Sequence, residues 1–256
     1  MQIILIISTI IVLFGLRLLW FNLFSANVQL EIKDGLLDLR NYEGEIETIH
    51  LDGEWNFYPN TWLIDLQNER KESAQPITVP GSWDEILQNE TDSIFGYGSY
   101  HLKILVDSND DSTYTLQVPS VRSSSELYVN GRYLGGYGKV GEDELSYIAE
   151  NIPLVASFTA DDNGVIDIVI QAANFKDIRG GGIIRSLSFG KEQVIAKELN
   201  VSIMLQYASA TFLLIHAIYS IILYFIDKRN KSLLYFSLFM FSTLFISLFA
   251  SDDKVT

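Results

Sequence analysis

The sequence predicts an all-β jelly-roll sandwich flanked by transmembrane α-helices. Apolar and polar residues alternate with a period close to two through much of residues 28–172, which is typical of antiparallel strands with one buried face. Glycine, proline, asparagine and aspartate residues separate these runs at short intervals, as in β-sandwiches and jelly rolls. Apolar segments long enough for a bilayer lie on both sides of this region, so we expect the sheet domain to be held at a membrane.

The stretch LYVNGRYLGGYG (127–138) is the clearest local element, because it places Asn130-Gly131 between two alternating runs. This pair favours a type I′ hairpin turn, in which both central residues need positive φ. Helical periodicity is nearly absent, apart from a short helix expected around Trp62 to Arg70. Further strands bounded by turn residues, including Asp34-Gly35, are predicted around residues 28–32, 100–106, 114–118 and 166–172.

Three apolar segments qualify as membrane spans: residues 3–24, 201–226 and 233–250. At about 1.5 Å per residue each can cross a hydrocarbon core of about 30 Å. The first is an anchor or a signal segment, and we favour the anchor because no basic residue precedes the run. The predicted parts are a transmembrane anchor or signal segment (1–25), an extracellular sheet domain (26–198) and two transmembrane helices joined by a short basic loop (199–256).

The charge around the last two spans predicts their orientation. Residues 227–231 (DKRNK) carry three positive charges, whereas residues 251–256 carry Asp252 and Asp253 against Lys254. Basic residues close to span ends stay in the cytoplasm. We therefore expect a multi-pass protein of the bacterial cytoplasmic membrane, with the loop inside and both the sheet domain and the C-terminus outside.

Composition disfavours several classes of function. The formal net charge is −14, and residues 25–200 hold 13 basic and 29 acidic residues. Such a surface repels nucleic acids and anionic head groups. The absence of cysteine excludes disulfides, thiol catalysis and cysteine-ligated zinc, and it suits an exported bacterial domain that is stable without oxidation.

A series of short motifs carries a resemblance to a known family. In order they are LDGEWNFYP (51–59), VPGSW (79–83), GYGSYHLKI (96–104), ELYVNG (126–131), GKVG (138–141), QAANF (171–175) and RGGGIIRSLSFG (179–190). Together with the spans that follow, they resemble the extracellular domain of bacterial seven-transmembrane receptors with diverse intracellular signalling modules. That domain is similar to galactose-binding-like domains and to the sugar-binding jelly roll of family 2 glycoside hydrolases.

The resemblance implies a sensor domain that binds a small molecule, for example a carbohydrate, and signals through the membrane helices. It also implies a chain that stops short of the remaining spans and of an intracellular output module, as a fragment or truncated relative would. A homodimer formed through the membrane helices is compatible with such a receptor. The alternative is a membrane-anchored carbohydrate-binding or adhesion protein without signalling output.

Four residues are candidate ligand contacts, because they lie on predicted turns or on the polar face of a strand: His101, Arg122, Tyr133 and Tyr137. A single surface histidine on a strand more often neither titrates functionally nor binds a ligand, so both interpretations of His101 stay open. Tyr128 also flanks the turn. Other aromatic residues in the matched motifs are interpreted as core: Trp55, Phe57, Trp83, Tyr97 and Tyr100.

Enzymatic chemistry is not expected. The three histidines include no pair at i, i+4 spacing, and glycosidases with this jelly roll carry their catalytic carboxylates in a separate barrel. No cofactor is predicted. Asp107, Asn109 and Asp111 alternate as in a calcium loop but lack its glycine and terminal glutamate, so structural calcium stays open. The glycines at 180–182 could face an anion, although glycines before a strand more often allow close packing.

Overall fold

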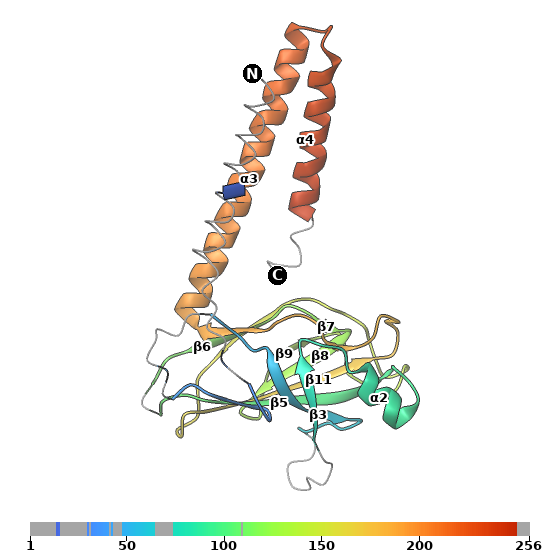
Figure 1. Ribbon diagram of the computed structural model, residues 1–256, viewed down its shortest axis with the longest axis vertical. Coiled ribbons are helices and arrows are strands. Elements are labelled where there is room, and N and C mark those ends of the chain that lie inside the picture. The colour runs from blue at the N-terminus through green and yellow to red at the C-terminus, as the bar shows by residue number, and fades with distance from the viewer. Residues whose placement is uncertain are drawn as a thin grey trace. The chain divides into compact units, whose positions relative to one another are not determined.

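The structure is a computed structural model that describes residues 14–15, 30, 32–40, 42, 48–64, 74–108 and 110–249 (Figure 1). The chain divides into two compact units, Met1–Leu30 and Glu31–Thr256. Only residues 14, 15 and 30 of the first unit are described. The predicted first span therefore lies almost wholly outside the described residues, as do residues 250–256 and Val28 of the expected first strand.

The larger of two main sheets, here called sheet A, has seven strands among the described residues. Every neighbouring pair is antiparallel except β1, which runs parallel to β5. Most of the predicted alternating runs fall in this sheet. In spatial order the strands are β4 (Gln75–Val79), β3 (Gly53–Pro59), β5 (Gly96–Leu105), β11 (Val165–Asn174), β8 (Ser124–Val129) and β9 (Arg132–Tyr137), with β1 (Leu36–Asp38) beside β5.

A smaller antiparallel sheet, sheet B, connects the domain to the helices that follow it. Its order is β10 (Leu154–Phe158), β6 (Tyr114–Val118), β13 (Ser188–Lys191) and β2 (Ile49–His50). A separate short pair joins β7 (Val121–Arg122) to β12 (Gly182–Ile183). The described part of residues 31–191 is thus mostly β-sheet, as the period-two pattern predicts.

One face of sheet A forms the main core. The aromatic residues expected to be buried confirm this, because Trp55, Phe57, Trp83 and Tyr100 are all fully buried. Each contributes about 1.5 to 3 kcal/mol through its removal from water. Tyr97 is the exception: it is half-buried and its ring lies 4.5 Å from that of Trp62. Aliphatic residues complete this face, namely Leu102, Ile104, Leu127, Val129, Ile166, Ile168 and Ile170.

The short helix predicted around residues 62–70 lies mostly outside the described residues. Trp62 to Ile64 are described and are not helical. A helix that we did not predict, α2 (Asp84–Thr91), follows Trp83 and ends at Asp92 in the left-handed region, φ 57°. Only Leu87 of its eight residues is buried, so it shows no repeating apolar face that a sequence pattern could indicate.

Two long helices follow sheet B. Helix α3 (Glu192–Ile226) begins directly after β13 and runs for 35 residues without a break, and α4 (Lys231–Phe249) has 19 residues. By length and composition alone, α3 is the one described helix apolar enough to cross a membrane. The stretch 192–200, which precedes the predicted span at 201–226, is therefore itself helical.

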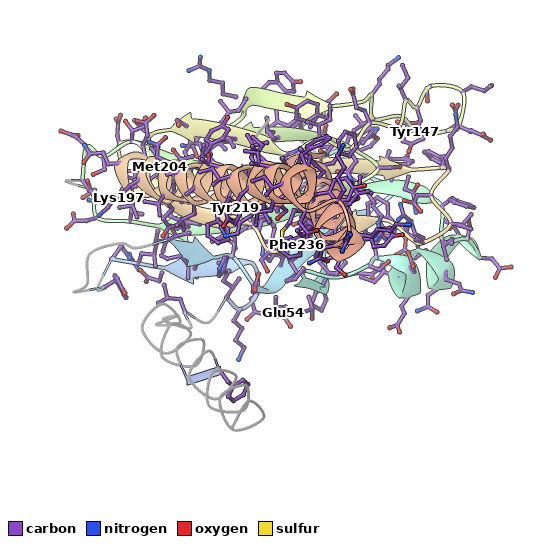
Figure 2. The ribbon with its side chains drawn as sticks, turned by 90° about the horizontal axis from the view of Figure 1, so that it is seen from above. Glu54, Tyr147, Lys197, Met204, Tyr219 and Phe236 are labelled. Atoms are coloured by element: carbon purple, nitrogen blue, oxygen red, sulfur yellow. The ribbon has the colours of Figure 1, made fainter. Side chains whose placement is uncertain are left out.

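The two helices pack against each other through small residues. Ser237 Oγ donates a hydrogen bond to the carbonyl oxygen of Ala217 at 3.0 Å, and Ala217 and Ser237 are both fully buried. Small residues at a helix contact are typical of packing in membranes, because they let the backbones approach closely. Large apolar side chains such as Met204 and Tyr219 on α3 and Phe236 on α4 are exposed instead (Figure 2).

Candidate functional site

The Asn130-Gly131 turn has the predicted geometry and also fixes a site residue on another strand. Asn130 and Gly131 have φ values of 51° and 74°, as a type I′ turn requires. The Asn130 backbone N–H donates to the carbonyl oxygen of Asp167 at 2.9 Å, and the Asp167 N–H donates to the Asn130 side chain at 2.7 Å. The turn thereby holds Asp167 of β11 in place.

Opposite the core, sheet A presents a second face that we call the polar face. A single row crosses four strands on it, since His101 pairs with Val169, Val169 with Tyr128 and Tyr128 with Tyr133. The rings of Tyr128 and Tyr133 lie 5.4 Å apart edge to face. The structure therefore places two of the four predicted contacts, His101 and Tyr133, in one row of one face.

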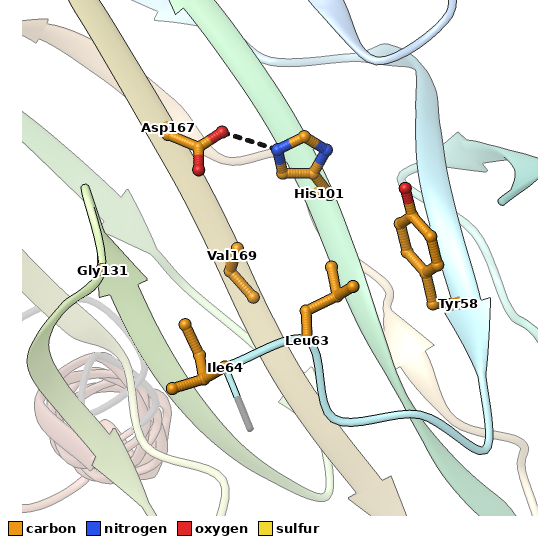
Figure 3. A pocket seen from close by; sticks show the side chains of 7 residues that line it. All are labelled: Tyr58, Leu63, Ile64, His101, Gly131, Asp167 and Val169. Carbon is orange, nitrogen blue, oxygen red and sulfur yellow. Dashed lines mark hydrogen bonds and ion pairs between the residues drawn. The ribbon is translucent and has the colours of Figure 1, made fainter. Parts of the chain in front are cut away.

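A loop after β3 partly covers the polar face. The Leu63 N–H donates to Ser99 Oγ at 3.1 Å, and Ser99 Oγ donates to the carbonyl oxygen of Thr61 at 2.7 Å. Between this loop and the sheet lies a cavity of about 150 Å³, here called the His101 pocket (Figure 3). Its lining consists of Tyr58, Leu63, Ile64, His101, Gly131, Asp167 and Val169.

The imidazole of His101 is oriented by a carboxylate. His101 Nε2 lies 2.6 Å from Asp167 Oδ1, and because an ionised carboxylate only accepts hydrogen bonds, Nε2 carries the proton. Nδ1 is buried and has no hydrogen-bond partner among the described residues. It points away from Asp167, toward the side of the pocket where Tyr58 lies (Figure 3), so it is the ring nitrogen that Asp167 does not engage.

The pocket combines a few polar groups with an apolar wall. Asp167, His101 and the Tyr58 hydroxyl supply acceptors and donors, and Leu63, Ile64 and Val169 supply apolar surface. This is the arrangement of small-molecule sites in general, in which apolar lining gives affinity and a few polar groups fix orientation. A ligand with several hydroxyl groups and apolar C–H faces matches both.

The other two predicted contacts lie elsewhere. A register shift in the β8–β9 pairing, between Leu127 and Tyr128, places Tyr133 opposite Tyr128 but Tyr137 opposite Ser125. Tyr137 therefore shares the face of Ser125 rather than that of Tyr133, because a bulge reverses the alternation of side chains. Arg122, on β7, lines a different cavity. The four residues do not form one site.

Sequence reasoning missed most of the pocket. Asp167, Tyr58, Leu63 and Ile64 were not among the predicted contacts. Asp167 alternates with buried Ile166 and Ile168, which places it on a polar face. Its proximity to His101 depends on the pairing of β11 with β5, 66 residues apart in the chain, which the sequence alone does not indicate.

The glycine stretch after Arg179 serves packing, as we favoured. A Cβ on Gly181 would lie 2.5 Å from the ring of Trp83, and the Gly181 N–H donates to Asp84 Oδ1 at 3.2 Å. Of the suspected calcium loop, Asn109 lies outside the described residues, and the neighbouring Asp110 forms an ion pair with Lys191 Nζ at 2.9 Å. Within the described part of the chain, no group of three or more acidic, histidine or cysteine side chains is placed to hold a metal ion.

Comparisons with solved structures identify several glycosidases as similar to part of this chain. A family 2 (GH2) beta-galacturonidase from Eisenbergiella tayi bound to glycerol is similar at a TM-score of 0.40, with 19% identity over 60% of this chain and 26% of that one. A beta-glucuronidase from Ruminococcus gnavus in complex with D-glucuronic acid has a TM-score of 0.43, with 14% identity over 59% of this chain and 30% of that one. A beta-glucuronidase from Faecalibacterium prausnitzii has a TM-score of 0.42, with 16% identity over 59% of this chain and 32% of that one.

The chain thus spans about a third or less of the length of these structures. No family model and no curated protein matches the sequence.

Proposed function

We propose that the chain is the sensor part of a bacterial membrane receptor. In this proposal a galactose-binding-like jelly-roll domain outside the cytoplasm binds a small polyhydroxylated molecule, a carbohydrate, and biases the membrane helices. The His101 pocket carries the proposal, because it joins an oriented imidazole, a carboxylate and a phenol to an apolar wall in a cavity of about 150 Å³. The domain binds and does not catalyse.

The chemistry of the pocket favours a sugar over an apolar ligand. A carboxylate such as Asp167 accepts hydrogen bonds from hydroxyl groups, and these charge-assisted bonds are about twice as strong as neutral ones. His101 Nδ1 would accept a further hydrogen bond from a ligand hydroxyl group. That bond would satisfy Nδ1, a buried atom that has no partner among the described residues. An apolar ligand would leave His101 Nδ1 desolvated without a hydrogen bond, at a cost of about 1 to 3 kcal/mol.

The junction between sheet B and α3 supports a signalling role. Because α3 starts at Glu192, directly after β13, no loop separates the sheet from the proposed span. Ser157 Oγ donates to Glu192 Oε1 at 3.3 Å, Thr48 Oγ1 donates to Glu198 Oε2 at 2.6 Å, and Ile195 is buried. A movement of sheet B would therefore be transmitted to α3 rather than absorbed by a linker.

The proposed topology rests on charge and apolar surface. We propose that α3 and α4 both cross the cytoplasmic membrane, with the basic residues Lys228, Arg229 and Lys231 on the inside and with the exposed apolar side chains of both helices facing lipid.

The test is a glycan array probed with the full chain in detergent micelles, followed by calorimetric titration of the strongest glycan. We expect His101→Gln and Asp167→Asn each to weaken binding about tenfold or more, because each removes a charge-assisted or buried hydrogen bond. His50→Gln is the matched control, since His50 is exposed on β2 of sheet B. Binding of no glycan, or equal binding by all variants, would overturn the proposal.

A further inference from the structure

A second cavity lies apart from the His101 pocket and shares no lining residue with it. Its volume is about 170 Å³, and three arginines line it: Arg122 on β7, Arg179 before β12 and Arg185 after β12. The side chains of Ser120 and Asn151 contribute neutral polar groups. We call this cavity the arginine pocket.

The carboxylate of Asp177 forms ion pairs with two of these arginines, Arg122 and Arg179. Arg179 donates from Nε to Asp177 Oδ1 at 2.9 Å and from Nη2 to Oδ2 at 2.7 Å. Arg122 Nε lies 3.9 Å from Asp177 Oδ2, and its Nη1 donates to the carbonyl oxygen of Arg179 at 2.9 Å. The hydrogen bonds from the Arg179 side chain and backbone lower the pKa of Asp177 to about 2, so this carboxylate stays charged.

The arrangement leaves donors for a ligand. Among the described residues, Arg122 Nη2 and Arg179 Nη1 take part in none of these hydrogen bonds. The Arg122 side chain is 22% exposed, and a partly buried guanidinium is costly unless it is paired. Two of the three guanidinium groups that line this pocket, those of Arg122 and Arg179, therefore share one carboxylate, Asp177.

This positive cluster stands out against the charge of the whole chain. The protein carries 18 basic and 32 acidic residues, so an anion is repelled by most of its surface and attracted to few places. Arginine is the side chain that best matches planar oxyanions, because its fork of N–H groups donates two parallel hydrogen bonds.

We propose that the arginine pocket binds a small molecule that carries an oxyanion group, a carboxylate or a sulfate. The arginines bind the oxyanion group, and the polar side chains of Ser120 and Asn151 contact the rest of the ligand. A cavity of about 170 Å³ is smaller than the roughly 300 to 1,000 Å³ of drug-sized sites, so the ligand is a monosaccharide-sized anion or smaller. The proposal does not depend on sugar binding at His101.

The experiment titrates the full chain in detergent micelles with sodium sulfate, with glucuronate and with glucose, the last two differing by a carboxylate in place of a hydroxymethyl group. We expect heat of binding from at least one of the anions, and a loss of about tenfold or more in anion affinity in Arg122→Gln and in Arg179→Gln. Binding of glucuronate alone assigns a carboxylate ligand, and binding of sulfate alone assigns a sulfate or phosphate.

Arg40→Gln is a closely matched control. Arg40 pairs with Asp38 through the same Asp-x-Arg spacing and the same bidentate geometry as Arg179 with Asp177, but it does not line the pocket. Arg40→Gln should leave anion binding unchanged. If Arg122→Gln destabilises the fold, the anion affinity of Arg179→Gln is the deciding measurement. The Arg179 side chain is 72% exposed, so its replacement should not disturb the fold. Absence of binding by both anions, or equal losses in Arg179→Gln and Arg40→Gln, would overturn the proposal.

Discussion

Replacing Gly131 by valine tests the turn that closes the β8–β9 hairpin. Gly131 has a φ of 74°, and a Cβ built on it meets no atom within 4 Å. The Cβ of a substituted residue therefore meets no obstacle, and the main effect expected comes from placing a β-branched residue at positive φ. This costs about 1 to 2 kcal/mol.

The expected size of the effect can be measured as a melting temperature. For a domain of about 150 to 250 residues, 1 kcal/mol shifts the melting temperature by about 2 to 4 °C, so Gly131→Val should melt about 2 to 8 °C lower. Differential scanning calorimetry of the full chain in detergent micelles measures this. Gly131→Asn is the control, because asparagine tolerates the left-handed region and should lose much less.

The turn assignment would be refuted if Gly131→Val had the same melting temperature as the unmodified protein. A loss in Gly131→Asn as large as that in Gly131→Val would refute the strain argument in a different way, since it would show that side-chain bulk matters and backbone φ does not.

Three further predictions concern pH, packing and topology. The pKa of Asp177 is lowered from 3.8 to about 2 chiefly by its hydrogen bonds with Arg179, so its stabilisation is present above pH 4 or so and is lost as the pH falls toward about 2. The melting temperatures of Asp177→Asn and the unmodified chain should therefore differ at neutral pH and converge on acidification, and a constant difference would contradict this. Gly181→Ala should lower stability in urea by about 1 to 3 kcal/mol, because its Cβ would lie 2.5 Å from the Trp83 ring; no change would contradict the packing. Because the protein has no cysteine, Asn230→Cys and Ser251→Cys can each be labelled singly with an impermeant maleimide in protoplasts or outer-membrane-permeabilised cells. Position 251 should react from outside and position 230 only after the membrane is opened, and the reverse order would invert the proposed topology.

The parts of the fold that depend on local chemistry could be predicted from the sequence. The turn at Asn130-Gly131 was predictable because few residues adopt two successive positive φ angles. The burial of Trp55, Phe57 and Tyr100 was predictable from the short motifs in which they lie. The start of α3 was less predictable. Residues 192–200 are polar enough to suggest a connection, but they continue the helix of the following apolar segment.

The parts that depend on pairing between distant strands could not be predicted. Tyr133 and Tyr137 are four residues apart, which predicts one shared face, but the bulge in β8–β9 separates them. The contact between His101 and Asp167 depends on the register of β5 with β11. The same holds for Arg122 and Asp177, 55 positions apart, whose proximity follows from the pairing of β7 with β12. A period-two pattern gives the face of a residue but not its neighbour across the sheet.

Hydrogen exchange measured by mass spectrometry, on the full chain in detergent micelles with and without the glycan selected by the array, tests the central claim most directly. The account predicts slower exchange at the amides around Leu63 and in the β5 and β11 segments that carry His101 and Asp167. It also predicts a change at residues 191–200, where β13 becomes α3, and the loss of both effects in His101→Gln. Protection at the pocket without any change at 191–200 would contradict signalling through α3, and protection that persists in His101→Gln would contradict the site itself.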